Sequence, residues 1–202
     1  KTILNGLAID DMGKAIERTL LAIKNNQTIA VYGDYDCDGV PGTALLRDVF
    51  QKINYKNVIY YIPHRHNEGY GLHNNAIDIL KSQGTELIIT IDLGTTNIKE
   101  VDYAASLQID TIITDHHLPH ETVDGQILPK AYAIINNKKN SCNYANKDLC
   151  GSGTIFKFVT CLLNELENIY NGDAAFTKFS KSDLMEQGIV LPQKGYEKWL
   201  LD

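Results

Sequence analysis

Five short runs of β-branched and other apolar residues alternate with segments in which apolar residues recur at helical spacing. The runs are Thr28–Tyr32, Val58–Ile62, Leu87–Ile91, Thr111–Thr114 and Tyr132–Ile135. Each run is continuously apolar, which is typical of strands buried on both faces of a parallel sheet. The alternation predicts an α/β fold, a doubly wound, mainly parallel five-stranded sheet with helices on both faces and right-handed crossovers.

Helices are predicted before, between and after these strands. Their expected ranges are Asp11–Lys24, Thr43–Lys52, Ala76–Gln83, Ile98–Leu107 and Thr154–Tyr170. Residues 1–170 are therefore assigned to one domain core. Residues 171–202 are polar and weakly patterned, and we expect a connecting segment there. The chain ends on WLLD (199–202), which we interpret as the start of a buried element that continues beyond the chain.

Composition narrows the class of protein. No apolar run approaches the roughly 20 residues of a membrane span, so no membrane association is expected. The four cysteines form no C-x-x-C pair, which argues against a zinc site and favours reduced thiols in the cytoplasm. Because the net charge is −6, a nucleic-acid partner would have to be held by local positive charge or by metal ions.

Side chains of the kind that bind metals follow three of the predicted strands. They are Asp34, Asp36 and Asp38 after the first strand, Asp92 after the third, and Asp115, His116 and His117 after the fourth. Open parallel sheets bind ligands outside the carboxyl ends of their strands, so these groups are expected to converge. Carboxylates with an imidazole suit Mn²⁺ or Mg²⁺ better than zinc, and a shared carboxylate can bridge two ions that clamp a phosphoryl group.

Each group of residues also has an ordinary structural interpretation. A D-x-D sequence after a strand often forms a solvated turn or a helix N-cap, and a single Asp92 is by default a loop residue. The metal site is favoured because three such groups occur at equivalent positions in the fold. Asp34 is expected to accept hydrogen bonds within its turn, in the second shell around the metal.

The same stretches resemble the DHH phosphoesterase superfamily. GDYDCDG (33–39), TIDLG (90–94) and TDHH (114–117) occur in the order of that superfamily, and the form GDYDxDG is similar to its RecJ branch. The stretches IPHRHNEGYGL (62–72), AIINNKK (133–139) and LCGSGTIFKF (149–158) resemble further motifs of this branch. The matches run from about Ile16 to Phe158 in the family's order.

The resemblance implies a hydrolase, a 5′→3′ exonuclease that acts on single-stranded DNA in repair or recombination. It implies two Mn²⁺ or Mg²⁺ ions, and a single-strand-binding protein or other repair factors as further partners. The implied metal ligands are Asp36, Asp38, Asp92 and His116, with Asp92 as the bridge. His117 would contact the scissile phosphate, and Asp115 would orient a histidine; both are counted as catalytic.

Further residues are candidates for contacts with DNA phosphates. The resemblance makes Arg65 one of them, since a planar guanidinium suits bidentate contact, although a solvated surface arginine is the alternative. The turn at Gly151, Ser152 and Gly153 opens a predicted helix and would expose backbone N–H groups to a phosphate; close packing is the alternative. Lys157 is a further phosphate candidate, with an exposed helix lysine as the alternative.

The sequence departs from the family pattern in ways that bear on activity. Many superfamily members have a histidine ligand at the position of Tyr32. The family also carries a further aspartate ligand and a substrate-gripping domain in regions beyond residue 202, so we expect a fragment with weak or no activity of its own. Two alternatives stay open: a DHH phosphoesterase acting on short oligonucleotides, cyclic dinucleotides or pyrophosphate, and an inactive RecJ-like scaffold.

Overall fold

The computed structural model describes residues 5–193 and residue 195, and its centre is one parallel sheet. The strands are β1 (Thr28–Gly33), β2 (Val58–Tyr61), β3 (Thr85–Ile91), β4 (Asp110–Thr114) and β7 (Ala133–Ile135). They lie in the order β2-β1-β3-β4-β7, and every neighbouring pair is parallel. The predicted α/β fold with a five-stranded parallel sheet is confirmed.

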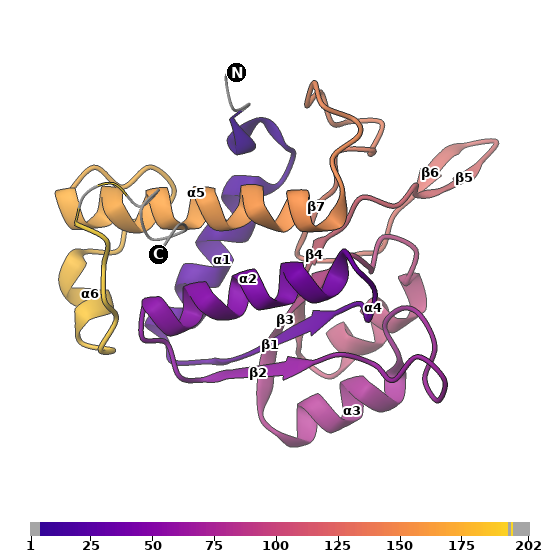
Figure 1. Cartoon of the computed structure of the whole chain (residues 1–202), viewed down its shortest axis with the longest axis horizontal. Helices are drawn as coiled ribbons and strands as arrows, with labels where there is room; N and C mark the ends of the chain where they lie inside the picture. The colour runs from indigo at the N-terminus through magenta and orange to yellow at the C-terminus, as the bar shows by residue number, and fades with distance from the viewer. Residues whose placement is uncertain (1–4, 194, 196–202) are drawn as a thin grey trace.

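Helices cover both faces of the sheet (Figure 1). One face packs against α1 (Met12–Lys24), α2 (Gly39–Lys52) and α5 (Gly151–Asn171), and the other against α3 (Asn74–Ser82) and α4 (Ile98–Ser106). Each face has its own apolar cluster, and the larger one lies under α1, α2 and α5. A 3₁₀ turn, η1 (Gly6–Ala8), precedes α1.

Strand order reverses at β1, which pairs with β2 on one side and with β3 on the other. The carboxyl ends of β1, β3 and β4 are then adjacent, as a doubly wound sheet requires at its ligand-binding edge. Backbone bonds continue the sheet one residue further, because Asp34 N–H donates to Ile91 O, Asp92 N–H to Thr114 O and Asp115 N–H to Ile135 O. Three aspartates are thus fixed at one edge by the ladder itself.

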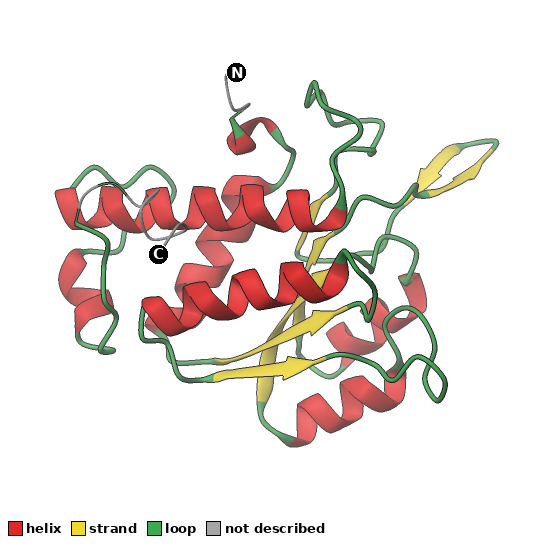
Figure 2. Cartoon of the chain, in the orientation of Figure 1, coloured by secondary structure: helices red, strands yellow, loops and turns green. Residues whose placement is uncertain are grey.

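Two features differ from the sequence-based expectation. A hairpin of β5 (His120–Thr122) and β6 (Gly125–Ile127) projects from the body of the chain (Figure 2). Helices α2 and α5 begin at Gly39 and Gly151, earlier than predicted, because the glycines there permit close packing that helix propensity does not reveal. For example, a Cβ on Gly42 would stand 2.7 Å from Ile91 Cγ2.

The segment after α5 packs against the core over its described residues. Helix α6 (Lys181–Met185) is fixed by an ion pair between Asp183 and Lys24, with an Nζ–Oδ1 distance of 3.1 Å. Leu184, Ile189 and Leu191 are buried in the larger apolar cluster. The predicted division at residue 170 stays a prediction, and the WLLD interpretation concerns residues 199–202, which lie outside the described part of the chain. No helix within residues 5–193 is long and apolar enough to span a bilayer.

Candidate metal centre

Side chains from three strand ends meet at the carboxyl edge of the sheet. Asp34, Asp36 and Asp92 each offer a carboxylate oxygen, and these three atoms lie within 4.8 Å of one another. A second group of the same dimensions consists of Asp92, His116 and His117. Asp92 belongs to both groups, which is the position that a bridging carboxylate would take. The convergence expected from the strand alternation is therefore present in the fold.

Asp92 lies at the centre of the two groups and is strained and buried. Its φ is 64°, a left-handed conformation that is uncommon outside glycine, and it is 1% exposed. Among the described residues its Oδ1 atom has no hydrogen-bond partner, although His116 Nε2 lies 3.2 Å away without hydrogen-bond geometry. Burial raises the pKa of the Asp92 carboxyl to about 8, and the charges of Asp38 and Asp36 add to this.

Asp34 and Asp36 differ in how well their charges are satisfied. Asp34 is 2% exposed, its Oδ1 has no hydrogen-bond partner within the described part of the chain, and burial raises its pKa. Burial also acts on Asp36, but N–H donation from Gly39 and Asp38 to its Oδ1 outweighs this and lowers the Asp36 pKa. Buried carboxylate oxygens without donors need a positive partner, so this set of atoms fits a divalent cation. Asp34 is thus a candidate ligand, where the sequence indicated only a second-shell position.

Asp38 lies beside the cluster but is already engaged by helix α5. Its two carboxylate oxygens accept N–H bonds from Gly151 at 2.6 Å and from Ser152 at 2.7 Å. Asp38 Oδ2 lies 3.8 Å from His116 Nε2. Gly153 N–H donates to Cys150 Sγ, so the three N–H groups predicted to face a phosphate all have partners. That phosphate contact stays a prediction, and the structure provides the close packing named as its alternative.

Asp115 holds His117 in place. Its Oδ1 accepts bonds from the backbone N–H groups of His116 and His117 and from His117 Nδ1 at 2.7 Å, while its Oδ2 accepts Thr95 N–H. Burial raises the pKa of Asp115, but these donors, led by His117, bring it down to about 2. An ionised Asp115 accepts the Nδ1 proton, which leaves Nε2 of His117 as the atom available to a ligand.

The two histidines have opposite pKa shifts. The hydrogen bond that His117 donates to Asp115 raises the pKa of His117, whose side chain is 45% exposed. Burial lowers the pKa of His116, and the neighbouring charge of His117 lowers it further. A neutral imidazole binds metals whereas a protonated one stabilises anions. The shifts therefore favour His116 as a metal ligand and His117 as a group that contacts a phosphate.

Two buried supports of this loop were not identified from the sequence. Asn136, which is fully buried, donates from Nδ2 to His117 O and to Thr95 Oγ1, both at 2.9 Å. Thr95 in turn donates to Asp115. Each follows a strand at the same edge of the sheet, Thr95 in TIDLGTTN and Asn136 in AIINN, and that position is the signal that could have indicated them.

The remaining candidates lie around this centre in different environments. Arg65 is exposed, and its guanidinium carbon lies 4.4 Å from the centre of the ring of Tyr35, the residue between Asp34 and Asp36. The Tyr70 hydroxyl donates to the backbone oxygen of Asp92 at 3.3 Å, and its oxygen lies 3.1 Å from His117 Nδ1. Tyr32, at the position of the family histidine, is fully buried and donates to Gly71 O.

The expectation that Lys157 is an exposed helix lysine was wrong. The residue is 8% exposed, because this side of α5 packs against η1, where a Cβ on Gly6 would stand 3.2 Å from Lys157 Cβ. The helix is covered here by the segment that precedes α1, which no periodicity in the sequence of α5 reveals. Its predicted phosphate contact was not tested and stays a prediction.

Comparison with known proteins identifies similar chains. The sequence model of a family described as "DHH family, N-terminal domain" matches residues 28–181. The single-stranded-DNA-specific exonuclease RecJ of Bacillus subtilis is 41% identical over 155 residues, and that of Escherichia coli is 36% identical over 162 residues. A crystal structure of exonuclease RecJ bound to manganese superposes with a TM-score of 0.70 and 27% identity, covering 81% of this chain and 40% of that one.

The aligned part is a small share of these relatives. The matches cover 77% and 80% of this chain but only 19% of the B. subtilis protein and 27% of the E. coli protein. The similarity therefore concerns the region that contains the sheet and the metal-type cluster. It supports the fold described above.

Proposed function

This chain belongs to the DHH family, and from that premise we propose that it is a metal-dependent phosphodiesterase, a 5′→3′ exonuclease on single-stranded DNA. The observation that carries the proposal is the pair of ligand groups that share the buried Asp92, whose Oδ1 has no donor. Similar chains are named single-stranded-DNA-specific exonucleases, and one was crystallised with manganese. A place in DNA repair or recombination, a cytoplasmic location and contacts with a single-strand-binding protein or other repair factors belong to the same proposal.

The residues that would hold Mn²⁺ or Mg²⁺ are carboxylates and the imidazole with the lowered pKa at this edge of the sheet. They are Asp36, Asp38, Asp92 and His116, with Asp34 as an additional candidate. A bound divalent ion neutralises phosphate charge and polarises a phosphoryl oxygen. Asp92, shared by both groups, would bridge two such ions. Both carboxylate oxygens of Asp38 already accept N–H bonds from α5. A metal ion bound by Asp38 would therefore share an oxygen with one of these bonds or displace it.

His117 is proposed to stabilise the phosphate that is cleaved. Asp115 accepts its Nδ1 proton at 2.7 Å, which turns Nε2 toward the side of the ring opposite Asp115. Because the bond to Asp115 raises the pKa of His117, the imidazole keeps a proton on Nε2 to a higher pH than a free histidine does. A protonated Nε2 can donate to a phosphate oxygen on which negative charge develops.

Arg65 is proposed to position the strand. The loop that carries it is tied by Glu68, whose carboxylate accepts His64 N–H at 2.7 Å and also the Tyr61 hydroxyl. The Arg65 guanidinium lies over the Tyr35 ring and remains exposed, so its N–H edge is available to a phosphate. The strand would then pass between this loop and His117.

The proposal is tested with oligodeoxythymidine labelled at the 5′ end or at the 3′ end, incubated with Mn²⁺ and a longer protein that contains this chain together with the family's further aspartate ligand and substrate-binding domain. We expect mononucleotides to be released from the 5′ end first, and Asp36→Asn to abolish the release. Asp102→Asn removes an exposed charge from α4 and is the matched control. Release from the 3′ end first, or a preference for dinucleotides, would favour another phosphoesterase. Binding of DNA without any cleavage in Mn²⁺ would favour the inactive scaffold.

A further inference from the structure

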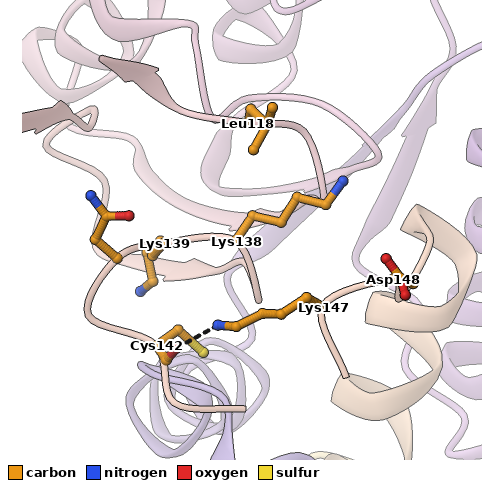
Figure 3. A pocket seen from close by; sticks show the side chains of 7 residues that line it. Leu118, Lys138, Lys139, Cys142, Lys147 and Asp148 are labelled. Carbon is orange, nitrogen blue, oxygen red and sulfur yellow. Dashed lines mark hydrogen bonds between the residues drawn. The ribbon is translucent and has the colours of Figure 1, made fainter. Parts of the chain in front are cut away.

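A lysine-lined cavity lies beside the metal centre. It has a volume of about 510 Å³, and its lining includes Leu118, Lys138, Lys139, Lys147 and Asp148 (Figure 3). The chain as a whole carries a net charge of −6, yet three lysines and one aspartate line this cavity. The excess of positive charge at this position is therefore local, as an anion-binding surface requires.

The three lysines are not equivalent. Lys139 Nζ donates to Asp11 Oδ2 at 3.2 Å and to Ile134 O at 2.6 Å, so its charge is paired. Lys147 Nζ donates to the backbone oxygens of Asn137 and Cys142, which satisfy its hydrogen bonds but carry no net charge. Lys138 has neither an ion pair nor a side-chain hydrogen bond with any described residue. Its ammonium group is the one available to a ligand.

Lys138 and Leu118 connect the cavity to the metal centre. Leu118 follows His117 directly and is 70% exposed, so its side chain is accessible to a ligand. Asn136 ties both segments together, because its Nδ2 donates to His117 O while its Oδ1 accepts Lys138 N–H at 2.8 Å. In the view of Figure 3 the Lys138 side chain lies between those of Leu118 and Lys147.

The β5–β6 hairpin is hydrogen-bonded to the segment that carries Lys138. Gln126 in β6 donates from Nε2 to Lys138 O at 3.3 Å, and its Oε1 accepts Asn140 N–H at 2.7 Å. The backbone around Lys138 is thus fixed on one side by Asn136 and on the other by Gln126. A site held by such supporting bonds is preorganised and loses little entropy when it binds a ligand.

We propose that this cavity is a nucleotide subsite next to the cleaved bond. Lys138 binds a backbone phosphate of the single strand, Lys147 adds positive potential, and Leu118 packs against the sugar or base of the same nucleotide. The inference rests on the proposed nuclease function, since it assigns this cavity to the strand on which the metal centre acts. A compact ammonium and an apolar side chain suit any nucleotide, so the subsite is not selective for sequence.

The test is the affinity of the chain for a fluorescent twelve-residue oligodeoxythymidine, measured by anisotropy in Ca²⁺ over a range of salt concentrations. Lys138→Gln is expected to weaken binding about tenfold, since a hydrogen bond to a charged group is lost. The slope of log affinity against log salt should fall by about 0.7, the value for one phosphate contact to a single strand. Lys138→Arg should restore most of the affinity and most of the slope.

Two further variants separate the contributions. Lys56→Gln removes an exposed lysine just before β2, at the opposite end of the sheet, and should leave affinity and slope unchanged. Leu118→Ala should weaken binding without changing the slope, because an apolar contact releases no counterions. The gain in melting temperature on adding Mn²⁺ should be the same in Lys138→Gln and the unaltered chain, which shows that the metal centre is intact.

Each other outcome overturns the proposal in a recognisable way. Equal affinities for Lys138→Gln and Lys56→Gln, with binding by the unaltered chain intact, would reject the subsite and leave the nuclease proposal standing. If the unaltered chain neither binds the oligonucleotide nor gains melting temperature from Mn²⁺, the subsite and the nuclease proposal are both rejected. If Lys138→Gln abolishes stabilisation by inorganic phosphate alone but leaves oligonucleotide affinity unchanged, the cavity binds free phosphate and not the strand.

Discussion

Gly151, the first residue of α5, packs directly on Asp92. A Cβ atom on Gly151 would stand 2.2 Å from Asp92 Oδ1, a separation that no real structure tolerates. The start of α5 therefore presses against the buried carboxylate that both ligand groups share. At the same position, Gly151 N–H donates to Asp38. One glycine thus fixes the distance between the end of β3 and the loop after β1.

Gly151→Ala is predicted to impair metal binding. The added methyl group has to displace Asp92 or the end of α5, and either movement changes the spacing of the ligands. We expect the affinity for Mn²⁺ to fall about 10–100-fold, as it does when the support of a metal ligand is lost. Isothermal titration with Mn²⁺ measures the change. Gly13→Ala in α1, where the new Cβ would meet only the Phe176 ring at 3.0 Å, is the control and should retain the affinity.

Asp92→Asn is predicted to stabilise the metal-free chain while it removes the effect of Mn²⁺. The Asp92 carboxyl is 1% exposed and its Oδ1 lacks a donor, so the metal-free fold is destabilised by this acid. An amide has no charge to bury, and several degrees of gain in melting temperature are expected in EDTA. Adding Mn²⁺ should then raise the melting temperature of the unaltered chain only. A lower melting temperature of Asp92→Asn in EDTA would contradict this account.

Asp38→Asn and Asp34→Asn are predicted to differ in the absence of metal. Asp38 accepts two backbone N–H bonds at the start of α5, and losing a helix cap of this kind costs about 1–2 kcal/mol. Asp34 Oδ1 has no donor to lose. In EDTA we expect a melting temperature lowered by about 3–6 °C for Asp38→Asn and not lowered for Asp34→Asn. An unchanged melting temperature for Asp38→Asn would show that the bonds from α5 contribute nothing.

Much of the fold could be predicted because a strand buried on both faces of a sheet appears in the sequence as a continuous apolar run. Runs such as Leu87–Ile91 contain only apolar and β-branched residues, and all five predicted runs are strands of the sheet. Helix starts were harder, since α2 begins with Gly39 and contains Gly42, which tertiary packing requires and helix propensity disfavours. The β5–β6 hairpin was missed because its two loop residues, Val123 and Asp124, are not one of the Asn-Gly or Asp-Gly pairs that mark such turns.

The location of the site was predictable because the topology of the sheet determines which loops meet at one edge. Once Asp34, Asp92 and His116 are placed after parallel strands, the sheet brings them to one edge. The sequence could not show which oxygens lack donors, because that depends on partners far along the chain. Asp38, for example, is bonded to Ser152, 114 positions later. Burial is equally nonlocal, so the sequence could not reveal that Asp34 and Lys157 are buried.

The pH dependence of stability tests whether the segment after α5 belongs to the core. Asp183 caps α6: its Oδ2 accepts Ser180 N–H at 2.7 Å, and its Oδ1 pairs with Lys24. The Ser180 bonds come first among the causes that lower the Asp183 pKa, and Lys24 adds to them. A lowered pKa in the fold means stabilisation that is present above the unfolded value of about 3.9 and lost as pH falls through the folded value.

Asp183→Asn is therefore predicted to lower the melting temperature at pH 7 on the order of 1–2 °C, and to have no effect near pH 2. Differential scanning fluorimetry across this range measures the difference, and Asp102→Asn, an exposed aspartate without such partners, should match the unaltered chain throughout. The effect requires that α6 stays docked on α1 in solution. If Asp183→Asn leaves the melting temperature unchanged at pH 7, residues 171–193 behave as a connecting segment, and the division at residue 170 is the better description.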